Sequence, residues 1–358
     1  MKIIHVNLAK TWRGGERQVA LLMQGLHEQG IQQVLVCRKG SALEEEAKKN
    51  NITCYSFNTL PFLPLFQSRV FRKLEKKGYK IIHCHESRAH TFGILGKIFW
   101  SKDQKLILHR RVIFPILKKP TTGIKYSEKY IDKIICISRA VETTVKESIG
   151  FQNTIVIPSM INLDSEEIQK YELREKWKIK TRFVIGYIAA LTEEKDHITF
   201  LRTAKQLLEQ HRKDIHFVII GEGPLKEDLI QFARKSGILK YVTFTGFVKN
   251  ISGAIQEIDL LLFTSVAEGL GSTILDFFVA GKPVVATKNG GSEELITNGR
   301  TGYLCDVGDF ETLAERVNFL LENPKKKEEI IKEARSFSRQ FGISSVTSKI
   351  VEVYKEVL

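Results

Sequence analysis

The stretch DLLLFTSVAEGLGSTILDFFVAGKPVVATKNGGSEELITNGRTGYL, residues 259–304, decides the fold class of this chain. It begins with an apolar run at 259–263, continues through a glycine-containing turn into a helical pattern at 272–281, and returns to an apolar run at 283–286. Strands of nearly continuous Leu, Ile and Val are typical of a parallel sheet covered by helices on both faces. The stretch therefore predicts a strand–helix–strand unit of an α/β protein.

The same alternation of apolar runs and helical patterns extends in both directions from this stretch. It breaks near Pro158 and resumes after the charged segment 164–180, which predicts a domain boundary near residue 165. At 358 residues, the chain also exceeds the size at which a single hydrophobic core usually stops growing. We expect strands at residues 2–8, 33–37, 53–57, 80–83, 105–109, 133–137 and 154–157, and then at 183–188, 216–220, 242–245, 259–263 and 283–286.

These elements predict an α/β protein of two Rossmann-like, doubly wound parallel-sheet domains with a cleft between them. The first domain is expected to span residues 1–165 and the second residues 166–341. Two helical patterns follow Asn323-Pro324. The last of them, residues 342–358, is expected to cross back to the first domain.

The positive charge of the chain is confined to its first half. Residues 1–165 hold 27 Lys and Arg against 13 Asp and Glu, residues 166–358 hold 28 of each kind, and the net charge is +14. A basic domain beside a neutral one indicates an anionic partner, which could be a membrane surface, a phosphorylated acceptor or a nucleic acid. The alternative is a solvated lysine-rich surface that binds no partner.

Composition excludes several classes of protein. The five cysteines are scattered and form no CxxC pair, which argues against a disulfide framework and against a zinc site. No uncharged apolar run reaches the roughly 18 residues that span a bilayer, and charge comes too early for a signal peptide. We therefore expect a cytoplasmic protein with reduced thiols. The first helix lacks a GxGxxG motif, which argues against a dinucleotide-dependent dehydrogenase.

Polar residues and glycines follow three predicted strands of the second half. Lys195 follows the first of these strands, Gly221 and Gly223 follow the second, and Glu268 follows the fourth. The carboxyl ends of parallel strands lie at one edge of a sheet, where open α/β folds bind their ligands. Glu268 precedes the predicted helix and Asp276 lies within it, so these two carboxylates can bracket one ligand.

The first half carries weaker signals. Gly14 and Gly15 lie between a strand and a helix, where backbone N–H groups can approach an anion, although a plain tight turn has the same sequence. His85 lies just beyond the fourth strand, on the same side as His83. No third ligand follows at a suitable spacing, so we predict no metal site.

Arg110 and Arg111 close the fifth strand. Their planar guanidinium groups suit the recognition of phosphate or carboxylate. Surface arginines paired with nearby acids would produce the same sequence.

With these motifs, the sequence resembles the retaining GT-B glycosyltransferases of family 4, a group that includes lipopolysaccharide-core and other cell-envelope transferases. The resemblance covers nearly the whole chain and is strongest over the stretch quoted first, where the family carries two acids separated by seven residues. It implies that Glu268 contacts the donor sugar and that Asp276 holds the ribose. It also implies that the diphosphate binds the backbone N–H groups of Gly271, Ser272 and Thr273.

The resemblance gives roles to the weaker signals as well. Lys195 would supply positive charge at the diphosphate, while the arginine usual five residues earlier is Ala190 here. Asp276 stands where the family more often has Glu. The catalytic residues implied are Glu268, Lys195 and His85, and the further donor-binding residues implied are Gly14, Gly15, Gly221, Gly223 and Val248.

The implied activity is sugar transfer, with retention, from a nucleoside-diphosphate sugar to a membrane-associated acceptor such as a lipopolysaccharide core or polysaccharide precursor. A nucleoside diphosphate is a good leaving group, so the protein mainly stabilises charge, here through Lys195 and the helix beginning at Gly271. The sequence contains no DxD motif, so we expect no cofactor, no metal and activity in EDTA. Double displacement through Glu268 is the alternative mechanism.

The acceptor is expected to bind the basic first domain through Arg17, Arg110 and Arg111. The apolar and basic segment 62–77 suits the inner face of the cytoplasmic membrane, although a helix packed on its own domain explains it equally well. One competing function is a non-catalytic protein that binds nucleic acid, but no such motif is present and nucleic acid is not an expected partner. Another is a GT-B sugar-nucleotide epimerase. The sequence predicts no oligomeric state.

Overall fold

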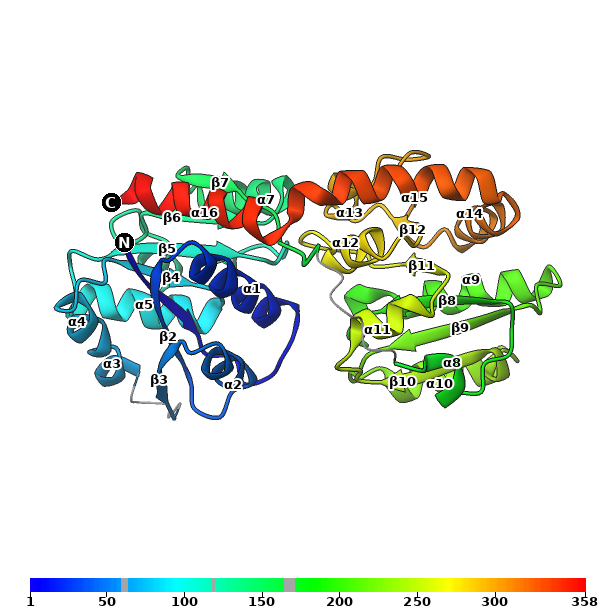
Figure 1. The fold of residues 1–358 in the computed structure, drawn as a ribbon, viewed down its shortest axis with the longest axis horizontal. Coiled ribbons are helices and arrows are strands. Elements are labelled where there is room, and N and C mark those ends of the chain that lie inside the picture. Colours follow the sequence, from blue (N-terminus) through cyan, green and yellow to red (C-terminus); the bar gives the residue numbers. More distant parts are fainter. Residues whose placement is uncertain (59–63, 118–119, 164–170) are drawn as a thin grey trace. The chain divides into compact units, whose positions relative to one another are not determined.

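The computed structural model describes residues 1–58, 64–117, 120–163 and 171–358. The chain forms two compact units, one made of Met1–Asn162 with Phe341–Leu358 and the other of Leu163–Gln340. Figure 1 shows that each unit is a sheet with helices on both faces. The predicted boundary near residue 165 and residues 62 and 63 of the predicted interfacial segment lie outside the described residues.

The first unit contains a seven-stranded sheet in the order β3-β2-β1-β4-β5-β6-β7, in which every pair of neighbours is parallel. Its central strands are short apolar runs whose side chains are buried on both faces, whereas the edge strands β3 and β7 are only partly buried. The strands are β1 (Lys2–Asn7), β2 (Gln32–Arg38), β3 (Thr53–Phe57), β4 (Ile81–Cys84), β5 (Lys105–Arg110), β6 (Lys133–Cys136) and β7 (Thr154–Val156).

The helices of the first unit include the last helix of the chain, as predicted. Helix α16 packs beside α1, and Ile350 and Tyr354 share a hydrophobic core with Leu22 and Leu26. These helices are α1 (Gly14–Glu28), α2 (Ala42–Lys49), α3 (Pro64–Gln67), α4 (Val70–Glu75), α5 (Ser87–Phe99), α6 (Thr122–Lys125), α7 (Arg139–Ile149) and α16 (Ile343–Val357).

The second unit contains a six-stranded parallel sheet in the order β10-β9-β8-β11-β12-β13. Its strands are β8 (Phe183–Ile188), β9 (Ile215–Ile220), β10 (Val242–Gly246), β11 (Leu260–Phe263), β12 (Val284–Thr287) and β13 (Tyr303–Cys305). Its helices are α8 (Leu173–Lys176), α9 (His197–Glu209), α10 (Lys226–Lys235), α11 (Ile251–Gln256), α12 (Ser272–Val279), α13 (Ser292–Leu295), α14 (Phe310–Glu322) and α15 (Pro324–Ser338), with 3-10 turns η1 (Glu193–Lys195), η2 (Leu239–Tyr241) and η3 (Arg339–Phe341).

The predicted α/β class and the predicted strands β1–β12 are confirmed. Strand β13 was not predicted, because its sequence YLC contains no β-branched residue, in contrast to the equally short β7 with the sequence TIV. In both sheets the strand order reverses beside the first strand, between β1 and β4 and between β8 and β11. Open α/β sheets bind ligands beyond the carboxyl ends of the strands at such a switch point.

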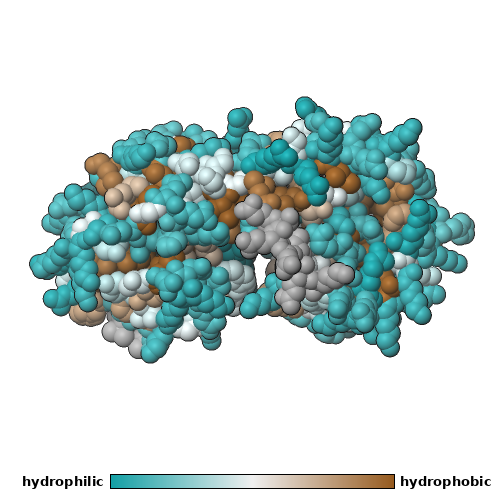
Figure 2. Space-filling model, in the orientation of Figure 1, coloured by the Kyte–Doolittle hydropathy of each residue, from teal (hydrophilic) through white to brown (hydrophobic). Residues whose placement is uncertain are grey.

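Hydrophilic residues dominate the face of the protein seen in Figure 2. Within the described residues, no helix is long and apolar enough to cross a membrane. All five cysteines are free thiols.

Candidate active site

Lys195 and Glu268 form an ion pair in the second unit, with Lys195 Nζ 2.5 Å from Glu268 Oε1. Lys195 ends η1, which follows β8, and Glu268 lies in the loop between β11 and α12. The adjacent strands β8 and β11 form the switch point of this sheet. The two side chains are 19% and 14% exposed, so the pair is largely buried but still within reach of a ligand.

The hydroxyl groups of Ser265 and Tyr187 support this ion pair through hydrogen bonds. Ser265 Oγ donates a hydrogen bond of 2.8 Å to Glu268 Oε1. The Tyr187 hydroxyl lies 2.9 Å from Ser265 Oγ and 2.7 Å from the backbone oxygen of Lys195. Burial raises the pKa of Tyr187 well above its usual value, so its hydroxyl stays neutral. Tyr187 and Ser265 therefore connect the two loops that carry the ion pair.

The segment after β12 supports the loop that carries Glu268. The backbone N–H of Glu268 donates to the carbonyl oxygen of Asn289 at 3.1 Å, and Glu268 forms a β-bridge with Gly290. A Cβ atom on Gly291 would lie 2.6 Å from the Cα of Leu270, so only glycine fits there. This support could not be predicted from the sequence, because the contact joins loops that follow different strands, β11 and β12.

Helix α12 presents polar groups beside the ion pair. Its N-cap, Gly271, has a φ of 81°, in the left-handed region that glycine adopts without strain. Ser272, Thr273 and Asp276 are half-buried, whereas the other faces of the helix are buried against the core. Because a helix N-terminus carries partial positive charge, this face can bind an anion and the hydroxyl groups attached to it.

Gly221 and Gly223 are required by backbone packing within the unit. A Cβ atom on Gly221, whose φ is 150°, would lie 1.9 Å from the oxygen of Ala189. On Gly223 it would lie 2.4 Å from the oxygen of Leu191. The two glycines therefore seat the loop after β9 against the loop after β8. Their predicted contact with the donor stays a prediction.

The turn predicted to contact the nucleobase follows β10. Gly246 at its start has a φ of 74°. Val248 is only 3% exposed, whereas its neighbour Phe247 is 63% exposed. The groups that this turn offers to a base are therefore backbone atoms and the Phe247 ring.

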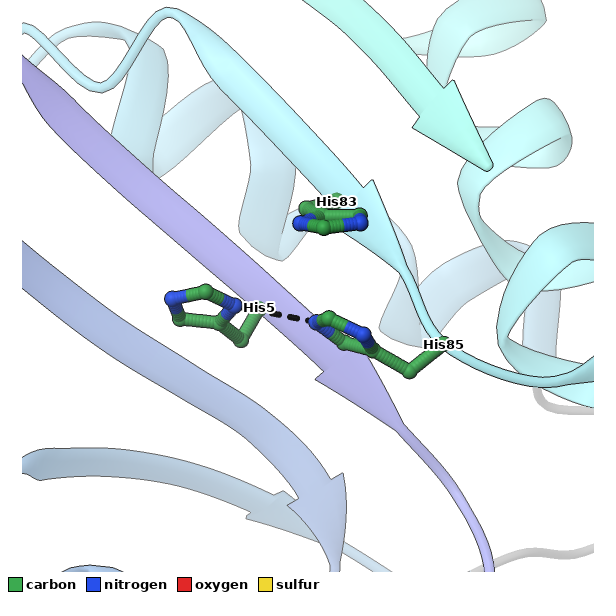
Figure 3. A group of neighbouring side chains, drawn as sticks. All are labelled: His5, His83 and His85. Carbon is green, nitrogen blue, oxygen red and sulfur yellow. Dashed lines mark hydrogen bonds between the residues drawn. The ribbon is translucent and has the colours of Figure 1, made fainter. Parts of the chain in front are cut away.

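Four buried histidines gather at the carboxyl edge of the sheet in the first unit. His5 on β1 pairs in register with His83 on β4, His85 lies just beyond β4, and His109 lies on β5. His5 Nδ1 is 3.0 Å from His85 Nε2 (Figure 3). All four are at most 5% exposed. His85 was predicted from the sequence but His5 was not, since the sequence does not reveal the strand order that makes β1 and β4 neighbours.

Arg111 and Tyr354 complete this histidine cluster. Arg111 Nη1 lies 3.5 Å from His85 Nδ1, and its Nη2 lies 3.2 Å from His109 Nδ1. Burial lowers the pKa of Arg111 to about 10, so the guanidinium is still a cation at neutral pH. The Tyr354 hydroxyl, from α16, lies 2.6 Å from His83 Nδ1. Arg111 therefore faces the histidines.

His5, His83 and His85 each offer a ring nitrogen, and these atoms lie within 4.8 Å of one another. Three neutral imidazoles are a common zinc ligand set. Burial favours the neutral form, since it lowers the pKa of His5 to about 3. Arg111, however, places a permanent positive charge against His85, which repels a dication. The residue types of this cluster therefore suit zinc, but the neighbouring Arg111 cation opposes its binding.

Gly14 and Gly15 form the first turn of α1. A Cβ atom on either would meet no atom of the described structure within 4 Å. Glu16 in the same turn is buried and accepts hydrogen bonds from the Asn7 side chain at 3.3 Å and from the Arg13 backbone at 3.0 Å. Gly14 is therefore exposed and Gly15 half-buried at the helix N-terminus, while the buried Glu16 stabilises the turn.

The other two predicted acceptor-binding arginines are Arg17 on α1 and Arg110 at the end of β5. Arg17 is half-buried on α1, and its backbone N–H donates to the oxygen of Arg13 at 3.1 Å. Arg110 Nη2 donates to the carbonyl oxygen of Phe114 at 2.5 Å. Their contact with an acceptor stays a prediction.

Two parallel α/β units, each with polar residues at its switch point, are the architecture of GT-B glycosyltransferases. The model of the family described as "Glycosyltransferase Family 4" matches residues 12–165, and the model described as "Glycosyl transferases group 1" matches residues 169–337. The chain therefore belongs to the family 4 glycosyltransferases.

Curated relatives include cell-envelope enzymes. The putative glycosyltransferase EpsD of Bacillus subtilis is 29% identical over 188 residues, which cover 52% of this chain and 49% of EpsD. The chain thus aligns with about half the length of this relative. The UDP-Gal:alpha-D-GlcNAc-diphosphoundecaprenol alpha-1,3-galactosyltransferase of Escherichia coli is 23% identical, covering 87% of this chain and 86% of that protein. The lipopolysaccharide core biosynthesis glycosyltransferase LpsD of Rhizobium meliloti is 23% identical, covering 92% and 91%.

Among solved structures, Anabaena Alr3699/HepE in complex with UDP and glucose superimposes with a TM-score of 0.86 and 20% sequence identity, covering 99% of each chain. This similarity confirms the predicted GT-B fold.

Proposed function

We propose that this chain transfers a sugar from a nucleoside-diphosphate sugar, and that the second unit binds this donor. The observation that carries the proposal is the Lys195–Glu268 ion pair beside the N-terminus of α12. It combines a cation for the diphosphate with a carboxylate for the sugar hydroxyls. The complex of HepE with UDP and glucose makes UDP-glucose the first donor to test.

The donor would lie along the carboxyl edge of this sheet. Lys195 keeps two ammonium protons for phosphate oxygens besides the one directed at Glu268. The N–H groups of Gly271, Ser272 and Thr273 would contact the diphosphate, and Asp276 would accept from the ribose hydroxyls. Glu268 Oε2 accepts no hydrogen bond within the described residues, so it is available to a sugar hydroxyl.

In the proposed reaction, the bond between the anomeric carbon and the diphosphate oxygen breaks while the acceptor oxygen bonds to the same carbon. The acceptor proton passes to the departing phosphate, which is released on the same face, so the anomeric configuration is retained. Lys195 and the α12 N-terminus stabilise the negative charge that develops on the phosphate. Because these groups supply the positive charge, we propose that transfer does not need a divalent metal.

We propose that the first unit receives an anionic, envelope-type acceptor at the inner face of the cytoplasmic membrane. The segment after β5 exposes apolar side chains, and the first half of the chain carries the whole excess of positive charge, a combination that suits an interfacial surface. Phe114 is 50%, Leu117 70% and Ile124 57% exposed. The E. coli relative is named for a lipid-diphosphate-linked acceptor. A lipopolysaccharide core or polysaccharide precursor would present similar anionic groups.

The direct test incubates the full chain with a panel of UDP- and GDP-sugars, with and without undecaprenyl-diphosphate-linked saccharides, in EDTA. We expect sugar transfer to a lipid-linked acceptor and an α-linkage from an α-linked donor, read by NMR of the product. Release of an epimerised sugar nucleotide without transfer would identify an epimerase instead. A salt-dependent shift of nucleic acid with no sugar-nucleotide binding would overturn the proposal.

A second test concerns the membrane. Binding to vesicles that contain anionic lipid should weaken as salt is raised, and binding to phosphatidylcholine vesicles should be much weaker. Equal binding to both kinds of vesicle would contradict a charge-assisted membrane surface.

A further inference from the structure

The side-chain hydrogen bonds of His85 have one consistent order of donor and acceptor, from Arg111 to His85 and from His85 to His5. A guanidinium group has only donors, so the contact from Arg111 Nη1 makes His85 Nδ1 an acceptor. In a neutral imidazole the other nitrogen then carries the proton, so His85 Nε2 donates to His5 Nδ1 across 3.0 Å. His5 Nδ1 is therefore an acceptor too, and its proton lies on Nε2.

In this arrangement the proton on His5 Nε2 is buried, and this nitrogen has no hydrogen-bond partner within the described residues. The series of hydrogen bonds therefore ends at His5.

We propose that Arg111, His85 and His5 form a directed hydrogen-bond chain that fixes His85 in its Nε2–H tautomer and holds its ring at the end of β4. His5 is then a positioning residue for His85, the histidine expected beside the donor sugar. The tautomer stands on geometry alone, whereas the catalytic consequence rests on the proposed function.

The hydrogen-bond chain determines which hydrogen bonds His85 can form with a substrate. With its proton committed to His5, His85 presents Nδ1 as a neutral acceptor, and its Arg111 contact there, at 3.5 Å, is longer than the 3.0 Å contact between His85 and His5. A sugar hydroxyl that donates to Nδ1 can therefore replace a weak interaction. Burial, reinforced by the neighbouring Arg111 cation, lowers the pKa of His85 well below its usual value and keeps the ring neutral.

The same direction opposes a metal at this cluster. A zinc ion held between His5 and His85 would need the lone pair of His85 Nε2, the nitrogen that faces His5, whereas the hydrogen-bond chain places a proton there. The chain and a metal centre therefore make opposite predictions for one atom.

The tautomers can be read directly from histidine ring nitrogens. In full-length protein labelled with 15N-histidine, long-range 1H–15N spectra should show His85 and His5 as Nε2–H tautomers at pH 7.5, unchanged by EDTA. Arg111→Met should remove the preference at His85, because the donor that fixes Nδ1 is lost. A wild-type His85 in the Nδ1–H form, or a signal that moves when EDTA is added, would contradict the proposed hydrogen-bond chain.

Activity then tests the positioning role. His5→Phe removes the acceptor while keeping a planar ring, and kcat should fall about 10- to 100-fold with the KM for donor changed less than about threefold. His5→Asn keeps an acceptor near the position of Nδ1 and should recover much of the loss. The matched control is His90→Phe, since His90 is also fully buried but lies outside the chain, and its kcat should stay near wild type.

If His5→Phe leaves both the His85 tautomer and kcat unchanged, the positioning role is wrong. If the tautomers are as predicted but the wild type turns over no donor, the proposed function is wrong and the hydrogen-bond chain is confirmed. The two failures are therefore distinguishable.

Discussion

Lys195 and Glu268 are 73 positions apart in the sequence, yet Lys195 Nζ lies 2.5 Å from Glu268 Oε1. The contact exists because β8 and β11 are neighbours at the point where the strand order reverses. Each side chain lies in a loop that follows one of these strands, and Ser265 and Tyr187 tie the two loops together. The ion pair is thus a direct consequence of the sheet topology.

Replacing Lys195 by Met should weaken UDP binding by about 10- to 100-fold, because a charge-assisted hydrogen bond to phosphate is lost. Isothermal titration with UDP measures the effect. Lys97→Met is the matched control, since Lys97 pairs with Asp132 at 3.1 Å with similar burial but belongs to the first unit. Equal loss of UDP affinity in both variants would point to a general effect on folding and against a diphosphate contact.

Glu268→Gln should lower kcat by about 10²- to 10³-fold while leaving the donor Kd within about threefold. The amide keeps an acceptor for Ser265 but loses the negative charge that balances Lys195. Single-turnover kinetics with radiolabelled donor separate binding from transfer. Mass spectrometry of the wild type should find no sugar attached to Glu268, and a trapped glycosyl-enzyme there would establish double displacement.

Two glycine variants should separate ligand binding from folding. Gly221→Ala should destabilise the protein by about 2–4 kcal/mol, because the new Cβ would meet the oxygen of Ala189 at 1.9 Å. Gly15→Ala meets no described atom within 4 Å and should leave stability within about 1 kcal/mol. If Gly15 approaches the donor phosphate, the second variant should nevertheless lose UDP affinity. Urea unfolding and UDP titration together check both expectations, and unchanged affinity in Gly15→Ala would remove this glycine from the donor site.

Acid should destabilise the protein through its buried histidines. Burial lowers the pKa of His5 and His90 to about 3, from about 6.5 in the unfolded chain. The unfolded state therefore binds more protons between pH 6.5 and pH 3, so stability falls as the pH falls through this window. Each such histidine should contribute about 1.4 kcal/mol per pH unit well inside it.

Thermal unfolding from pH 7.5 to pH 4.5 measures this dependence. His90→Phe removes one buried histidine and should flatten the curve, whereas His27→Phe, at an exposed position, should leave it unchanged. A stability that rises on acidification would contradict a neutral, buried cluster.

The sequence by itself determined the elements and most of the candidate residues. Short runs rich in apolar and β-branched residues, separated by helical patterns, located strands β1–β12, and the central strands are apolar along their length because they are buried on both faces. The order of these elements also placed Lys195, Glu268 and His85 after strands, at the edge where parallel sheets bind ligands.

Only the tertiary structure decided which of these residues meet. Nothing local in the sequence shows that β1 lies beside β4 or β8 beside β11, because strand order follows from packing of the whole sheet. His5, Tyr187 and Asn289 were therefore missed, although each contacts a residue that had been selected. The steric requirement for glycine at Gly221 and Gly291 is likewise visible only in the folded structure, because it comes from backbone segments that approach one another after folding.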